Sequence, residues 1–251
     1  MHELATRAEN RFRFSKKELI QLTITVLVAA FILSFRKWGG EEFSFEEGLA
    51  NFLIIAIIVF VSFIIHFSTQ KLVALKMGYE SRYRYWVNGL LISVIVCFFT
   101  YGYFPLFFTG SLWHDVIPKL RIGVFRGGAK HKDLGYIAFA GPFSNMVIVG
   151  LLTPIYIATD SSFVYTIIVA NLLIAVFSLL PIPTFEKIRQ FKGGTTGLYL
   201  FIASRWIFVL VFVTFLAFAA LILLFQVFSY IIALLIGAII TIVYYLRFEV
   251  E

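Results

Sequence analysis

The chain alternates between long apolar runs and short polar segments. Five runs contain no charged residue and are long enough to cross a membrane: 19–35, 48–70, 134–159, 161–185 and 206–246. One span needs ~20 apolar residues. The last run has 41 residues, so we expect it to form two spans. The pattern therefore predicts an all-α polytopic membrane protein with about six transmembrane helices.

One further apolar run, 85–109, does not fit this series. Basic segments flank it on both sides, and Gly102 and Pro105 interrupt it. Both residue types disfavour a continuous helix. We interpret the run as a re-entrant or membrane-surface element between spans 2 and 3, which enters and leaves on the same side. The alternative is a seventh full span.

The loop charges predict an orientation in the membrane. Segments 1–17, 71–84, 110–133 and 184–205 each carry a net charge of +3, whereas the loop 36–47 carries −2. Basic loops tend to stay in the cytoplasm. We therefore expect both termini of this multi-pass protein to be cytoplasmic.

Composition supports the membrane assignment. Apolar residues make up 61% of the chain and charged residues 14%, whereas soluble domains carry about 25% charged residues. The lipid bilayer is thus one expected partner, and nucleic acid is not.

Candidate chemistry appears at the end of the second run, in His66-Phe67-Ser68-Thr69-Gln70. Zinc proteases carry His-Glu-x-x-His on a helix, where the two histidines bind zinc and the Glu is the general base. Here Phe67 occupies the position of the base and Gln70 that of the second ligand. A phenyl ring cannot accept a proton, and an amide is a poor zinc ligand.

Two more segments follow in order: AGPFSN at 140–145 and NLLIAVFSLLPIPTFEK at 171–187. With the first motif they resemble the site-2 protease family of intramembrane zinc metalloproteases over about residues 48–190. In active members of that family the Asn of the second motif is thought to assist the substrate carbonyl, and an Asp in the third motif is a zinc ligand. Glu186 occupies the position of that Asp.

The resemblance implies a protease scaffold with a degenerate active site. We expect no catalytic residue, no bound metal and no cofactor. Phe67 and Gln70 are expected to pack where spans 2 and 4 meet, close to Glu186. The vestigial centre would comprise His66, Phe67, Gln70 and Glu186, and the former substrate groove Asn145, Pro181 and Pro183.

The predicted function is therefore not proteolysis. Segment 1–17 would be a cytoplasmic N-terminal segment, 18–190 the site-2-protease-like core, and 191–251 a two-span hairpin with a short tail. Such a pseudoprotease would bind or scaffold a transmembrane partner, as an assembly, chaperone or structural subunit of a membrane complex. The alternatives are a small transporter or channel, which the uncharged apolar runs disfavour, and an atypical intramembrane protease.

Overall fold

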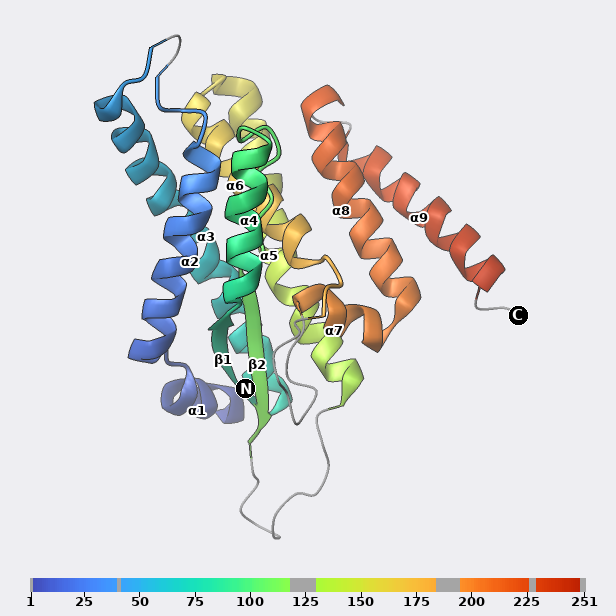
Figure 1. Cartoon of the computed structure of the whole chain (residues 1–251). Coiled ribbons are helices and arrows are strands. Elements are labelled where there is room, and N and C mark those ends of the chain that lie inside the picture. Colours follow the sequence, from blue (N-terminus) through green and yellow to red (C-terminus); the bar gives the residue numbers. More distant parts are fainter. Residues whose placement is uncertain (1, 40–41, 118–129, 184–194, 226–228, 249–251) are drawn as a thin grey trace.

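The computed structural model describes residues 2–39, 42–117, 130–183, 195–225 and 229–248. The long helices lie side by side in one bundle, with the first helix and two short strands toward one end (Figure 1). In chain order the elements are α1 (His2–Arg11), α2 (Lys16–Ser34), α3 (Phe45–Met77), β1 (Tyr79–Tyr85), α4 (Val87–Phe99), β2 (Gly110–Val116), α5 (His131–Thr159), α6 (Ser162–Ser178), α7 (Thr196–Ala203), α8 (Arg205–Phe225) and α9 (Ser229–Phe248).

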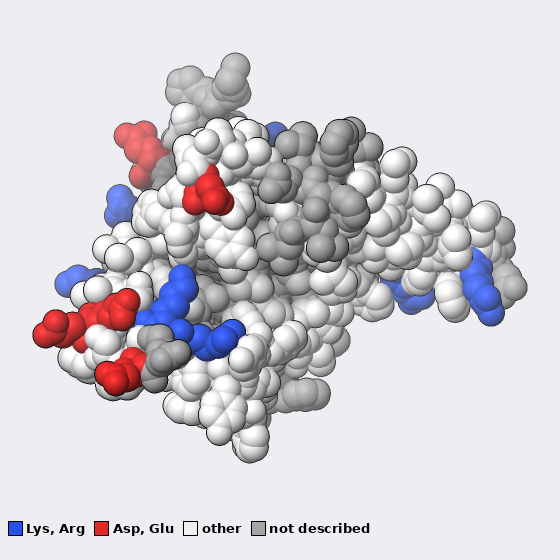
Figure 2. All heavy atoms as spheres, turned by 90° about the horizontal axis from the view of Figure 1, so that it is seen from above, with Lys and Arg blue, Asp and Glu red and all other residues white. Residues whose placement is uncertain are grey.

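Four helices within the described residues are long and apolar enough to cross a membrane: α2, α3, α5 and the Arg205–Ile222 part of α8. Helix α6 and the segment Ile232–Phe248 of α9 are also apolar but shorter. The protein is thus mostly helical with four candidate spans, whereas the number six stays a prediction. Seen from above, charged side chains form small separate patches on a mostly uncharged surface (Figure 2).

Helix α3 is the longest element and lies at the centre of the bundle. Its 33 residues span roughly 50 Å, more than the ~30 Å apolar core of a bilayer. Ser44 caps its first turn, and Gly78 ends it with a φ of 89°, which glycine adopts readily. Because α3 extends past the apolar run, its last turns carry Lys71 and Lys76 toward β1.

The two strands correct the all-α prediction. β1 and β2 form an antiparallel pair in which Tyr79 lies opposite Val116 and Tyr85 opposite Gly110. Along β1, buried Tyr79, Ser81 and Tyr83 alternate with more exposed charged residues. This period of two is the mark of a half-buried strand. The alternation is visible in the sequence, but it is short compared with the apolar runs that predict helices.

The run 85–109 forms a helix followed by an extended return. Helix α4 leads away from β1, and residues 100–109 come back to β2 (Figure 1). Because Tyr85 pairs with Gly110, both ends of the segment meet at the same place. Whether the segment enters and leaves a membrane on one side stays a prediction, as does its depth there.

The main core forms where α3 meets α2, α6 and β1. Its buried side chains include Leu22 and Val26 of α2, Val59 and Phe63 of α3, and Ile174 of α6. Helix α5 covers another face of α3. At the C-terminal side α9 packs along α8, where Gly237 lies so close to Thr214 that a Cβ there would overlap its hydroxyl group.

Candidate functional site

His66 and Gln70 lie on the face of α3 that contacts α5. Residues four apart on a helix share one face, and both side chains are only 1% exposed. The His-x-x-x-Gln spacing thus places two polar groups side by side in the interior. In a zinc protease this is the position of the two histidine ligands.

Helix α5 presents the second motif to these side chains. A Cβ atom on Gly141 would lie 2.6 Å from His66 Nε2 and 2.6 Å from Gln70 Nε2. No real Cβ atom tolerates such contacts, so the backbone of α5 approaches α3 closely only because residue 141 is glycine. The structure therefore brings the first two sequence motifs together.

Asn145 of α5 is the hydrogen-bond partner of His66. His66 Nδ1 lies 3.1 Å from Asn145 Oδ1. An amide oxygen only accepts hydrogen bonds, so the imidazole proton lies on Nδ1 and the lone pair on Nε2. The Asn145 amide nitrogen is buried and has no partner among the described residues. It remains a hydrogen-bond donor inside the protein.

Gln70 has a different structural role. Its Nε2 donates a long hydrogen bond of 3.4 Å to the carbonyl oxygen of Ala138. That carbonyl would normally accept from the N–H of residue 142, which is proline and has none. Gln70 thus partly satisfies the backbone acceptor that Pro142 leaves free in α5.

Phe67 lies on the adjoining face of α3, and its ring meets that of His66 in an edge-to-face contact with centroids 5.0 Å apart. Its ring is buried, stacks on Phe63 with centroids 5.7 Å apart, and lies 4.5 Å from the ring of Tyr83 in β1.

Phe67 shares its core cluster with Ala170 and Ile174 of α6, the predicted span 4, and also packs against β1. Gln70 instead bonds to α5. The reason is helical geometry, since residue 67 is rotated by about 100° from residue 66.

A curated protein is similar to this chain in overall sequence. The "Putative zinc metalloprotease MJ0611" of Methanocaldococcus jannaschii is 31% identical over 186 residues, which cover 72% of this chain and 86% of the relative. The chain belongs to this zinc-metalloprotease-like family. No family model matches it, and no solved structure does.

The described residues of this metalloprotease-like chain do not fit a catalytic zinc ion. Such an ion has three protein ligands, mostly His and carboxylate groups. His66 Nε2 could serve as one, but the Gln70 NH₂ group is a donor turned to Ala138. The described residues contain no group of three His, Cys, Asp or Glu side chains that could hold a metal ion.

The third motif is only partly described. Helix α6 ends at Ser178, before Pro181 and Pro183, which are both exposed. Asn171 is buried in α6 and donates to the carbonyl of Ile167 at 2.9 Å. The predicted site residue Glu186 lies outside the described residues, so its place relative to His66 stays a prediction.

A buried ion pair beside the centre was missed from the sequence. Lys71, which follows Gln70, donates to Glu18 Oε1 at 2.7 Å, and both side chains are buried. Glu18 Oε1 also accepts from the N–H of Tyr83 at 2.7 Å, and Oε2 from the N–H of Ser15 at 2.8 Å. One carboxylate therefore joins the start of α2, the end of α3 and β1.

A local signal for this pair exists in the sequence. Ser15-Lys16-Lys17-Glu18 precedes an apolar run, and Ser-x-x-Glu in that position is a capping box. Both of its hydrogen bonds form at the start of α2. The capping box predicts the helix start, but it gives no indication that the partner of Glu18 is Lys71.

Proposed function

We propose that this chain is a catalytically inactive, site-2-protease-like membrane protein that binds a transmembrane segment of a partner. The observation that carries the proposal is the place of Phe67. The residue in the position of the general base is part of the hydrophobic core, in contact with Phe63 and Tyr83. Nothing at that position can take a proton from water.

Loss of the base and loss of a ligand act independently. Metal-assisted hydrolysis needs a bound ion, an activated water and a group that accepts its proton. Phe67 removes the last of these. Gln70 removes a ligand, because its amide completes the hydrogen bonding of α5 instead. Restored proteolysis would need two separate replacements, so a binding role suits the site better.

An apolar cavity supports binding of a helical segment. A cavity of about 640 Å³ lies where α5, α7 and α8 meet, and most of its lining is apolar. Tyr136, Phe139, Leu200, Trp206 and Val211 are among its lining residues. A cavity of this size accommodates several apolar side chains of a partner helix but not the whole helix.

The first test is the metal content of the purified protein. We expect far less than one zinc ion per chain, and the same low content in a His66→Ala variant. A content close to one zinc per chain that is lost in His66→Ala would contradict the proposal.

The second test addresses the partner. Phe139→Trp should fill part of the cavity between α5, α7 and α8 and abolish co-purification of a stoichiometric membrane partner. Leu235→Trp on the exposed face of α9 is the matched control and should retain the partner. If both variants keep the partner, binding takes place elsewhere and the assignment of this cavity is wrong.

A further inference from the structure

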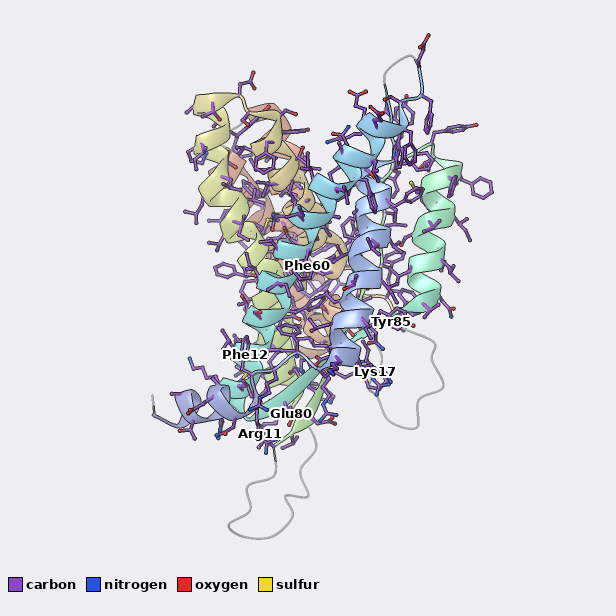
Figure 3. The ribbon with its side chains drawn as sticks, turned by 90° about the vertical axis from the view of Figure 1, so that its left-hand side faces the viewer. Arg11, Phe12, Lys17, Phe60, Glu80 and Tyr85 are labelled. Carbon is purple, nitrogen blue, oxygen red and sulfur yellow. The ribbon has the colours of Figure 1, made fainter. Side chains whose placement is uncertain are left out.

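A second, charged cavity lies between the α1–α2 linker and β1. It has a volume of about 630 Å³ and is lined by Arg11, Arg13, Glu18, Glu80 and Arg82, together with small or uncharged residues. A smaller cavity of about 180 Å³ adjoins it, shares Ser15, Glu18 and Arg82 with it, and adds Lys17 and Arg84. We call the two together the basic cavity. Figure 3 shows Arg11 beside Glu80 at the foot of the bundle, and Lys17 at the start of α2.

Both carboxylates of the basic cavity are already engaged. Glu80 pairs with Arg11 at 2.6 Å and with Arg82 at 3.0 Å. Glu18 pairs with Lys71 in the interior. The five basic residues of the lining therefore exceed the local acidic charge.

Three cations of the basic cavity have no carboxylate partner among the described residues. Arg13 and Lys17 are exposed, and no carboxylate of the described residues contacts either side chain. Arg84 lies over the ring of Trp113, 4.0 Å from its centroid. Guanidinium and ammonium groups gathered in one hollow are typical of phosphate recognition.

An apolar stripe continues from this cavity along α2. Lys17, Ile20, Ile24 and Leu27 follow one another at helical spacing and share one face. Ile20 is 62% exposed, Ile24 39% and Leu27 45%. Because α2 is one of the candidate spans, this face would lie against acyl chains when the basic cavity lies at the headgroups. A free phosphate ion has no acyl chain and would not contact this apolar stripe.

We propose that the basic cavity binds the phosphate headgroup of an anionic membrane lipid, whose acyl chains lie along Ile20, Ile24 and Leu27. Arg13 and Lys17 would contact the phosphate directly, with Arg82 and Arg84 at its sides. Basic pockets beside spanning helices commonly bind such headgroups. Lipid binding at this place is independent of whether the centre near His66 is catalytic.

The test uses the full chain purified in a zwitterionic detergent and titrated with phosphatidylglycerol. Bound lipid is counted by native mass spectrometry. An Arg13→Gln, Lys17→Gln double variant should bind the lipid roughly 25-fold more weakly, since each basic residue near an anionic lipid contributes about fivefold. An Arg13→Lys, Lys17→Arg variant keeps both charges and should retain most of the binding.

The matched control removes one lysine and one arginine elsewhere. Lys132 and Arg205 are exposed and lie beside the apolar cavity on the other side of α5. A Lys132→Gln, Arg205→Gln variant should keep its affinity within about twofold. Equal losses in both double variants would show attraction by overall charge only and would overturn the proposal.

A competition experiment with a soluble phosphate compound distinguishes binding of lipid from binding of free phosphate. Glycerol phosphate should compete poorly with phosphatidylglycerol, and Ile20→Gln, Ile24→Gln should weaken lipid binding without changing binding of glycerol phosphate. If glycerol phosphate competes as well as the lipid does, the site is one for soluble phosphates and the lipid assignment is wrong.

Discussion

The two faces of α3 at the segment His66–Gln70 differ in what they contact. On the face toward α5, His66 and Gln70 remain polar, buried and in contact with the AGPFSN segment. On the face toward α2 and β1, Phe63, Phe67 and Lys71 form core packing and a buried ion pair. One face places polar groups in the interior, and the other forms core packing and an ion pair.

This difference suits the aromatic side chain at position 67. A Glu at position 67 would be surrounded by aromatic side chains and would need a partner in the interior. A phenyl ring needs none and adds apolar contact area. Phe67 therefore adds packing energy on one face of the helix, while the opposite face contacts Gly141 and Asn145.

The largest effect is expected from breaking the ion pair on the face toward α2 and β1. Lys71→Met leaves Glu18 buried without its cation, and such a loss costs about 3–5 kcal/mol of unfolding free energy. A Glu18→Gln, Lys71→Met double variant should recover most of it, because Gln can still form the capping box. Chemical denaturation in detergent measures both values.

Lys76→Met is the control for this experiment. It removes the same side chain type from an exposed position on the same helix and should cost less than about 1 kcal/mol. If Lys71→Met costs no more than Lys76→Met, the pair contributes little and the two faces of α3 differ less than we infer.

The next effect concerns Phe67 itself. Phe67→Ala should lower the unfolding free energy toward the lower end of about 3–5 kcal/mol, since the neighbouring rings can close part of the cavity. Phe60→Ala is the control, because Phe60 on the same helix is 40% exposed. Equal losses for the two variants would contradict a core role for the residue in the position of the base.

Helices, their order and the meeting of the first two motifs follow from apolar runs and motif spacing. The neighbours of Phe67 cannot be predicted in this way, because they depend on which elements pack against each face of α3. The β1–β2 pair was missed because its period-two pattern covers seven residues among much longer helical runs. The role of Gln70 was also hidden, since it depends on Pro142, which is distant in the sequence.

The polar face is tested by a smaller change. Gly141→Ala places a Cβ atom 2.6 Å from both His66 Nε2 and Gln70 Nε2, so α3 and α5 must move apart. Such overpacking should cost about 1–3 kcal/mol. Gly150→Ala in the same helix is the control at a less buried position. A neutral Gly141→Ala variant would mean that the two helices do not need this close approach.

The last effect is a pH dependence at β2. His114 bonds to Ser81 at 2.7 Å, and burial lowers its pKa from 6.5 to about 4. Between these two pH values the unfolded chain binds a proton at this position and the folded chain does not, so stability falls as pH drops from 6.5 toward 4. His114→Gln should therefore reduce the fall in melting temperature between pH 6.5 and pH 4. His131→Gln, at the exposed start of α5, is the control and should show the same fall as the parent. A slope that both variants share with the parent would show that His114 does not account for the acid sensitivity.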